Sequence, residues 1–258
     1  LTASAQRFVK TFNTVAAMLA ANPNDVHTNI VVAGYYSAND GGGGEFVYNG
    51  SSTTATNWGT VFKPTSFDGR FLRQNVERFN VKQFGARGDG TTDDATQFTN
   101  AIAVANGREV YLPASTYRIG TQLSFVTTFA GTYTNGLKIV GDGSEKTILD
   151  TRVASAALIR VDTDAVSAAR FQRGVLLSGF QITGSVGNPA SADGISLRHA
   201  YDVRIDDVRI RNLTGTGILI TATEGDTDGC NQVAISNSRI EVCAGWGINV
   251  NCSSGVNE

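Results

Sequence analysis

The last third of the chain repeats one short pattern, and this repeat limits the possible folds more than any other feature. Three similar segments, VLLSGFQITGS, VRIDDVRIRNL and VAISNSRIEVC, begin at Val175, Val203 and Val233. A second series, GISLR, GILIT and GINVN, alternates with the first along the chain. One copy is too short to bury its own apolar face, so such copies stack on one another and share a continuous core.

The spacing within each copy predicts short strands separated by a bend. Polar turn-formers divide the copies at Ser178-Gly179, Asp206-Asp207 and Ser236-Asn237. Aliphatic residues recur at matching offsets, namely Leu177, Ile205 and Ile235 in one row and Ile182, Ile210 and Ile240 in another. Three copies are too few to close a propeller, but they suit a solenoid in which equivalent residues stack. We therefore predict an all-β chain that contains a parallel β-helix. Its earlier, less regular coils are expected to contain Leu137, Ile139, Ile148, Ile159 and Val161.

The composition fits this fold and excludes several classes of function. The chain has 258 residues, of which 29 are Gly and only 4 are Pro, and this mixture indicates many tight turns. The net charge is −2, so no nucleic-acid partner is expected. No apolar run is long enough to cross a bilayer, and the three Cys lack the spacing of a zinc site. We therefore expect no membrane segment, no metal and no cofactor.

The first 78 residues are predicted to form two smaller parts. Phe8, Phe12, Val15 and Leu19 fall on one stripe, which predicts an N-terminal helix within residues 1–22. Such a stripe packs against a neighbouring domain or forms a seam between identical chains. Residues 23–78 alternate in short strands, which predicts a small β-rich region. Its run of four glycines at 41–44 lacks the Lys and helix of a phosphate-binding loop, so we expect a hairpin loop there.

From residue 79 the pattern changes to a strand, a Gly-rich turn and a helix at about 93–106. Thr92 is the expected N-cap, with Asp93 and Asp94 in the first helical turn, where the helix dipole favours negative charge. The spacing of the acidic residues does not fit a calcium loop, and the tripeptide Arg87-Gly88-Asp89 is interpreted as part of the turn. A solenoid exposes apolar side chains at its open end, and this helix is placed to cap it.

These segments resemble a known superfamily. FNVKQFGARGDGTTDDATQFTNAI followed by REVYLPASTYRI is similar to the start of the pectate-lyase-like, right-handed parallel β-helix. The preceding FNTVAAMLAAN…VVAGYYSANDGGGGEFVYN resembles the N-terminal region of bacteriophage tailspike proteins. The resemblance covers residues 8–119, and the coil repeat extends it to 258. It implies that residues 23–78 lie close to the phage particle and that residues 79–258 form the β-helix.

The resemblance also implies a function. A tailspike is a homotrimer that is attached to the phage tail or baseplate and acts outside the bacterium. It binds host surface polysaccharide (capsule, exopolysaccharide or O-antigen) and often cleaves it as a hydrolase or lyase. The sequence starts at Leu1 without a Met and stops at Glu258 inside a strand pattern, so we expect a fragment with an incomplete β-helix. The active site of the full-length protein is then expected either here or further along the helix.

Candidate site residues come from the longest insertion between the coils. The loop TATEGDTDGCNQ at 221–232 carries Glu224, Asp226 and Asp228, which we interpret as candidate catalytic carboxylates. Solvated acidic residues in a loop would give the same pattern. Tyr201 and Trp246 are candidate sugar-stacking residues, although buried packing would also explain them. His199 is expected at the surface.

Three functions remain open at this point. The first is a phage tailspike that depolymerises polysaccharide. The second is a non-catalytic receptor-binding or structural segment of a phage tail. The third is a secreted cellular polysaccharide lyase or hydrolase, for which a stable trimer would be unusual.

Overall fold

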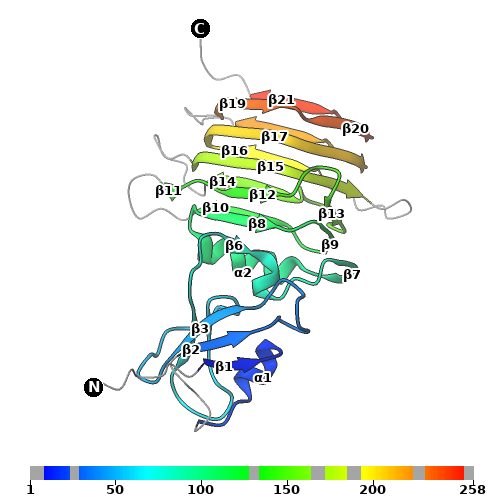
Figure 1. Ribbon diagram of the computed structural model, residues 1–258. Helices are drawn as coiled ribbons and strands as arrows, with labels where there is room; N and C mark the ends of the chain where they lie inside the picture. Colours follow the sequence, from blue (N-terminus) through cyan, green and yellow to red (C-terminus); the bar gives the residue numbers. More distant parts are fainter. Residues whose placement is uncertain are drawn as a thin grey trace.

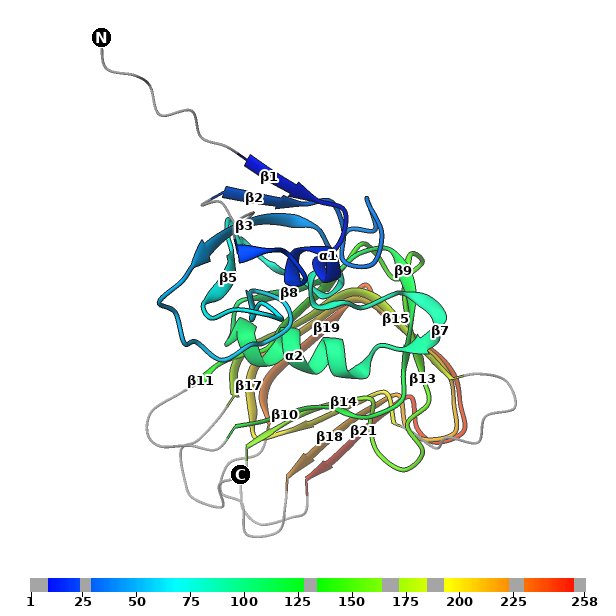
Figure 2. The same ribbon diagram turned by 90° about the horizontal axis from the view of Figure 1, so that it is seen from below.

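The computed structural model describes residues 9–23, 29–127, 134–163, 172–184, 193–222 and 230–252. They form an N-terminal β-sheet followed by a parallel β-helix, whose coils rise one above another toward the C-terminus (Figure 1). A helix lies across the end of the β-helix that faces the N-terminal sheet (Figure 2). The predicted all-β, parallel β-helical fold is confirmed. None of the helices within the described ranges is long and apolar enough to cross a membrane.

The N-terminal sheet has the strand order β1-β2-β3-β5-β4. Its strands are β1 (Val9–Phe12), β2 (Asn29–Val32), β3 (Gly44–Asn49), β4 (Val61–Phe62) and β5 (Arg70–Arg73). One face packs with the short helix α1 (Val15–Leu19) around a core that includes Met18, Phe46 and Phe62. The predicted hairpin at the glycine run is confirmed, because β2 and β3 pair antiparallel on either side of it.

The N-terminal helix predicted within residues 1–22 is largely wrong. Residues 9–12 form strand β1, which pairs in parallel with β2, and the helix covers only Val15–Leu19. The Thr14 side chain caps this helix by accepting a hydrogen bond from the Ala17 N–H at 3.1 Å. Phe12 of the apolar stripe lies in β1, Val15 and Leu19 lie in α1, and Phe8 lies outside the described residues. A short isolated helix is marginal in water, so pairing with a distant strand outweighs the local pattern.

The glycine run wraps around one buried side chain, Arg73. Its guanidinium group donates hydrogen bonds to the carbonyls of Gly59 (2.7 Å), Gly43 (2.6 Å) and Gly42 (3.0 Å). Burial lowers the pKa of Arg73 to about 10. A side chain at Gly43 would collide with the backbone of strand β2, and one at Gly44 with the guanidinium group itself. The glycines are therefore needed for close approach to Arg73, rather than for binding phosphate.

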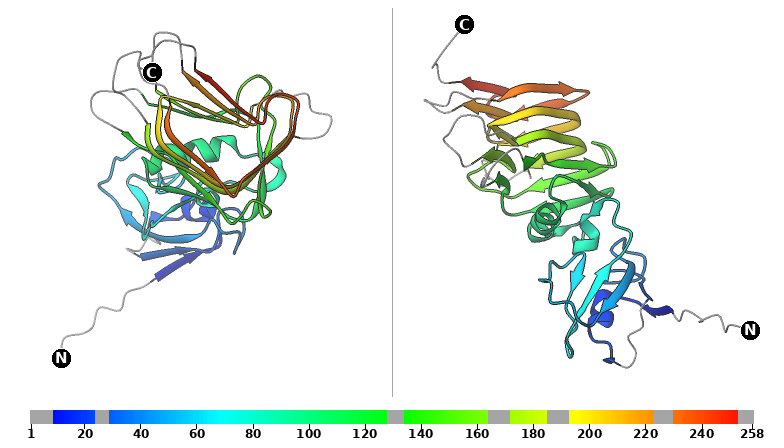
Figure 3. Two further views of the ribbon diagram at one scale, coloured as in Figure 1. Left: turned by 90° about the horizontal axis from the view of Figure 1, so that it is seen from above. Right: turned by 90° about the vertical axis from the view of Figure 1, so that its left-hand side faces the viewer.

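The β-helix has three faces, seen end-on in Figure 3, and each coil after the first contributes to all three. The first face contains β6 (Phe79–Asn80), β8 (Glu109–Leu112), β12 (Lys138–Gly141), β19 (Asn231–Ser236) and the first halves of β15 (Gln172–Gly184) and β17 (Ala200–Leu213), with β11 (Thr134–Asn135) beside β15. The second face contains β7 (Asp89–Asp93), β9 (Ser115–Ile119), β13 (Thr147–Thr151), β20 (Arg239–Cys243) and the second halves of β15 and β17. The third face contains β10 (Leu123–Thr127), β14 (Ile159–Thr163), β16 (Ile195–Arg198), β18 (Ile218–Ala222) and β21 (Ile248–Cys252).

The strand register confirms the repeat predicted from the sequence. Leu177, Ile205 and Ile235 are aligned on the first face, and Ile182, Ile210 and Ile240 on the second. The interleaved series pairs in the same way on the third face, where Ile195, Ile218 and Ile248 are aligned. Ile148 lies in coil strand β13, as predicted, but in the outward row opposite Gln181, whereas its neighbour Leu149 is fully buried and pairs with Ile182. A slip of one residue in a strand moves a side chain to the other face.

The corners between the faces rely on residues with left-handed backbone conformation. Gly179, Asp207 and Asn237 occupy the predicted bend in three consecutive coils, and all have positive φ. Asn212 and Val242 are equivalent residues one coil apart and also have positive φ, 55° and 53°. Asn tolerates this region, but a β-branched residue such as Val is strained there.

We expect the substitution Val242→Asn to stabilise the protein. Removing the strain should raise the free energy of unfolding by about 1 kcal/mol, because the side chain is 75% exposed and loses little packing. The matched substitution Asn212→Val should lower the free energy of unfolding by a similar amount. Urea unfolding of both variants measures the two changes. An equal loss of stability in both variants would contradict this account of the corner.

Helix α2 (Ala95–Ala105) covers the first coils through Phe98, Ala101 and Ala105. Its expected start at Thr92 is wrong, because residues 89–93 form strand β7 and Asp94 occupies the N-cap position. The fully buried Asp94 carboxylate instead accepts hydrogen bonds from the N–H groups of Arg87 (2.7 Å) and Gly88 (2.9 Å). The Arg-Gly-Asp tripeptide is therefore held by its own backbone against the start of the helix, as its structural interpretation predicted.

Candidate functional site

A buried charge cluster lies where the strands of the third face end. Strands β14, β16 and β18 run in parallel, so their carboxyl ends meet at one edge. Asp162 and Arg198 lie at equivalent positions near the ends of β14 and β16, and His199 follows Arg198 at the corner. We call Arg160, Asp162, Arg198 and His199 the Asp162 cluster.

The carboxylate of Asp162 is the centre of this cluster and is only 2% exposed. It accepts hydrogen bonds from Arg160 Nη2 at 2.5 Å and from Arg198 Nε at 2.9 Å, and His199 Nδ1 lies 3.3 Å away. Burial alone would raise the pKa of Asp162, but the hydrogen bonds from Arg160 and Arg198 outweigh burial and hold the pKa below its usual 3.8. Asp162 is therefore ionised and paired, which suits a structural anchor better than a general acid.

His199 is buried, so its expected place at the surface is wrong. Its residue exposure is 5%, and its φ of 51° is unusual for a residue other than Gly. The contact with Asp162 explains both the burial and the positive φ of His199, because it holds the imidazole ring beneath the corner of the coil. Non-glycine residues in this conformation concentrate at functional sites. The half-buried Tyr201 follows at the start of β17, and the Arg173 guanidinium lies 4.8 Å from the centre of its ring.

The candidate catalytic carboxylates Glu224, Asp226 and Asp228 lie outside the described residues. Their loop leaves β18 after Ala222, and Thr221 pairs with Arg198 of the Asp162 cluster. The loop therefore starts at the same edge as the cluster and Tyr201.

Trp246 lies at the opposite edge of the third face, just before β21, where its carbonyl accepts a hydrogen bond from the Gly217 N–H. It is 70% exposed. The structure thus brings Tyr201, but not Trp246, close to the start of the predicted loop.

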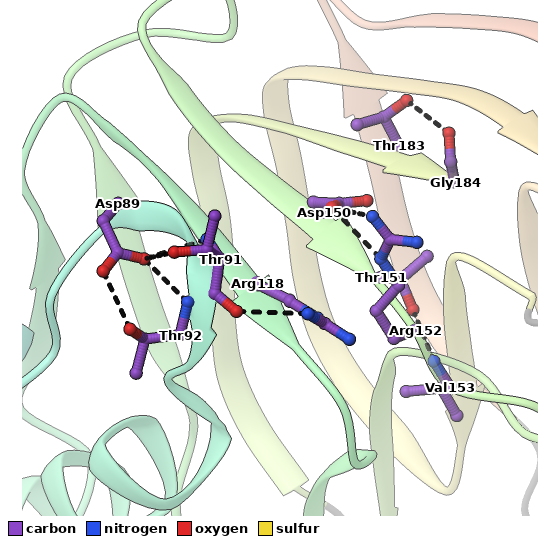
Figure 4. Close-up of polar contacts among 10 residues, drawn as sticks. All are labelled: Asp89, Thr91, Thr92, Arg118, Asp150, Thr151, Arg152, Val153, Thr183 and Gly184. Atoms are coloured by element: carbon purple, nitrogen blue, oxygen red, sulfur yellow. Dashed lines mark hydrogen bonds and ion pairs between the residues drawn. The ribbon is translucent and has the colours of Figure 1, made fainter. Parts of the chain in front are cut away.

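A second group of charged residues, which the sequence analysis missed, lies on the outer surface of the second face. Successive coils align Arg118, Asp150, Thr183, Arg211 and Glu241 in one outward row. Figure 4 shows the lower part of this row, from Arg118 beside Thr91 to Thr183. In the neighbouring row, Arg209 of β17 lies opposite Arg239 of β20 in the strand register. The signal was present in the repeat, since these two Arg occupy the same offset in successive copies.

The Glu241 carboxylate is surrounded by arginines on this face. It forms ion pairs with Arg209 at 2.5 Å and with Arg239 at 3.0 Å, and the charge of Arg211 also acts on it. The hydrogen bond from Arg209 is the largest influence and, with these charges, lowers the pKa of Glu241. Asp150 is likewise paired, with Arg152 at 2.8 Å. Within the described ranges, no three His, Cys, Asp or Glu side chains come together as metal ligands do.

Two family models match consecutive parts of the chain. Residues 11–76 match the phage tail protein small four-stranded beta-sheet domain. Residues 78–254 match rhamnogalacturonase A/epimerase, pectate lyase-like.

Individual proteins show the same likeness. Capsule KN3-specific depolymerase 1 of Klebsiella phage KN3-1 is 28% identical over 157 residues, which are 57% of this chain and 20% of that protein. Mannuronan C5-epimerase AlgE3 of Azotobacter vinelandii is 42% identical over 76 residues, 28% of this chain and 4% of the epimerase. This chain therefore spans only a small part of either relative.

Two solved structures share the fold. The gp42 tailspike of Acinetobacter phage vb_AbaP_AS12 has a TM-score of 0.62 at 15% identity, over 94% of this chain and 49% of that one. Tailspike protein 2 of Escherichia coli O157:H7 bacteriophage CAB120 has a TM-score of 0.53 at 18% identity, over 92% of this chain and 36% of that one. The resemblance to phage tailspikes is confirmed. With more than half of its residues matched by one family model, the chain belongs to the rhamnogalacturonase A/epimerase, pectate lyase-like family.

Proposed function

We propose that this chain is part of a phage tailspike that binds and depolymerises a surface polysaccharide of the host bacterium. One observation carries the proposal: a phage-tail sheet domain at 11–76 continues directly into a pectate-lyase-like β-helix at 78–254. The first part suits attachment to a virion, and the second suits contact with a long sugar chain. The capsule depolymerase among the relatives supports a capsule as the target.

The division of labour follows the two parts of the chain. Residues 23–78 form the particle-proximal region, which contacts other phage tail or baseplate proteins. Residues 79–258 form the polysaccharide-binding β-helix, and the full protein assembles as a homotrimer on the virion. The secreted cellular enzyme considered from the sequence is disfavoured, because the phage-tail domain match covers residues 11–76.

We further propose that Glu224, Asp226 and Asp228 supply the catalytic carboxylates. Hydrolysis of a glycosidic bond uses two carboxyl groups, whereas elimination uses a base and a cation that neutralises the uronate. The loop starts beside Arg160 and Arg198, whose side chains are 41% and 34% exposed, and these two cations are suited to neutralising a uronate. Tyr201 and Trp246 are proposed as sugar contacts, with Tyr201 at the same edge.

The test is cleavage of a panel of purified capsular polysaccharides, with reducing ends and unsaturated uronates followed in parallel. The triple variant Glu224→Gln, Asp226→Asn, Asp228→Asn should lose at least about 100-fold in rate while still binding the polysaccharide. The control is Asp202→Asn. Asp202 is exposed and has a left-handed backbone conformation, which Asn tolerates. Equal rates in wild type and triple variant would remove these residues from the chemistry. Binding without cleavage by the wild type would favour a non-catalytic receptor-binding segment.

A further inference from the structure

The short segment that joins the N-terminal sheet to the β-helix is held from both sides. The Asn75 side chain donates a hydrogen bond to the Glu45 carboxylate of strand β3, at 2.9 Å. The carbonyls of Val76 and Glu77 accept hydrogen bonds from Arg108, which follows the capping helix α2. A hinge needs a few residues that can absorb large changes of φ and ψ. These contacts restrain the residues that would have to absorb them.

The two parts also pack directly against each other beside this segment. Phe84, at the end of the 3-10 helix η2 (Val81–Phe84), is 1% exposed and belongs to the core of the β-helix. Its ring lies against Gly59 in the turn before β4, where any side chain would collide with the ring. Gly42 of the glycine run likewise lies against the backbone carbonyl of Lys82. Closely packed groups resist compression and transmit displacement, so one part cannot easily slide over the other.

A tyrosine of the N-terminal sheet provides a polar contact across the same junction. The Tyr36 hydroxyl donates a hydrogen bond to the Gly85 carbonyl at 2.9 Å, and the Arg87 guanidinium lies 3.9 Å from the centre of the Tyr36 ring. The loop that carries this tyrosine is itself fixed, because the Asp40 carboxylate accepts hydrogen bonds from four of its backbone N–H groups. Tyr36 therefore joins the two parts at a well-defined point.

We propose that the N-terminal sheet and the β-helix form one rigid unit, in which the contacts of Gly59 with Phe84 and of Tyr36 with Gly85 take the place of an interdomain hinge. Relative motion is the usual behaviour of two domains of one chain, unless their interface is large and apolar. Here the interface includes a residue of the β-helix core, so the sheet cannot tilt without disturbing that core.

The role of the rigid unit rests on the proposed function. A sheet that is attached to a virion would hold the axis of the β-helix in a fixed direction. A displacement of the polysaccharide-bound β-helix would then reach the virion instead of being absorbed at a hinge.

The experiment measures rotational correlation times of backbone amides by nuclear magnetic resonance relaxation, separately for strands β2, β3 and β5 and for strands β8, β12 and β15. The variants are Gly59→Ala, which forces a methyl group against the Phe84 ring, and the milder Tyr36→Phe, which removes only the hydrogen bond across the junction. Gly50→Ala is the matched control, because a methyl group there would first meet the Tyr48 side chain of its own sheet. Thermal unfolding checks that each variant is folded.

In the wild type we expect the same correlation time for the sheet and for the coils. Gly59→Ala should shorten the correlation time of the sheet relative to that of the coils, Tyr36→Phe should do so to a smaller extent, and Gly50→Ala should leave the two equal. Wild type and Tyr36→Phe carry the test if Gly59→Ala fails to fold.

A shorter correlation time for the sheet than for the coils in the wild type would overturn the inference. Equal times for both parts in the wild type and in every folded junction variant would also overturn it, because the named contacts would then not be what joins the parts. The measurement uses no polysaccharide, so its result is independent of the proposed function. Failure to bind any polysaccharide would contradict that function and leave the rigid unit in place.

Discussion

Replacing Ile205 by Asp is expected to lower the free energy of unfolding by about 3–5 kcal/mol, because it places an unpaired charge in the solenoid core. Ile205 is fully buried between Leu177 and Ile235 of the adjacent coils. This aliphatic row offers no cation or polar partner to the Asp side chain. Any rearrangement of the neighbouring side chains would also disturb the coils above and below. Urea unfolding followed by circular dichroism measures the loss.

The matched control for this substitution is the preceding residue of the same strand. Arg204 points outward and is exposed, so Arg204→Asp should change the free energy of unfolding by no more than about 0.5 kcal/mol. A similar loss in both variants would mean that general strand propensity, rather than core burial, explains the effect. A soluble, fully stable Ile205→Asp protein would rule out the stacked core.

Replacing Arg73 by Met is expected to cost about 3 kcal/mol, because it leaves the carbonyls of the glycine loop without a donor. The guanidinium group joins Gly42 and Gly43 in one loop to Gly59 in another, and it also lies 4.5 Å from the ring centre of Phe46. Met retains much of the side-chain volume, so the loss reports mainly on hydrogen bonding. Thermal unfolding of the isolated protein measures it.

Arg70, on the same strand, provides the control. It also donates to backbone carbonyls, those of Gly69 and Thr54, but its bond to Thr54 is exposed and water can replace the guanidinium group there. We expect Arg70→Met to cost less than about 1 kcal/mol. A loss of stability as large as that of Arg73→Met would show that burial of the acceptor carbonyls does not determine the size of the loss.

The fold could be predicted because a parallel solenoid places the same offset of each repeat at the same point of the core. Val175, Val203 and Val233 are aligned both in the sequence and in the structure. The predicted N-terminal helix was too long because a distant contact, rather than a local pattern, determines the structure of residues 9–12. The strand of Val9–Phe12 depends on pairing with Asn29–Val32, a contact that no local pattern reveals.

The candidate site was less predictable from the sequence. Asp162 and Arg198 are 36 residues apart in the chain, yet adjacent strands bring them into hydrogen-bond contact. His199 was expected at the surface because no pattern in the residues around it in the sequence indicates burial at a corner. The cluster of arginines around Glu241 could have been predicted, since alignment of the copies places Arg209 and Arg239 at the same position of successive coils. Which of these groups would contact a ligand depends on the path of that ligand, and residue spacing alone does not determine the path.

The central claim is that this chain recognises polysaccharide on a bacterial surface. The most direct measurement is the binding of fluorescently labelled protein to a set of encapsulated strains and to capsule-deficient mutants of the same strains. Our account predicts binding to at least one encapsulated strain and loss of that binding in its capsule-deficient mutant. Equal binding to both members of every pair, or binding to none of the strains, would contradict it.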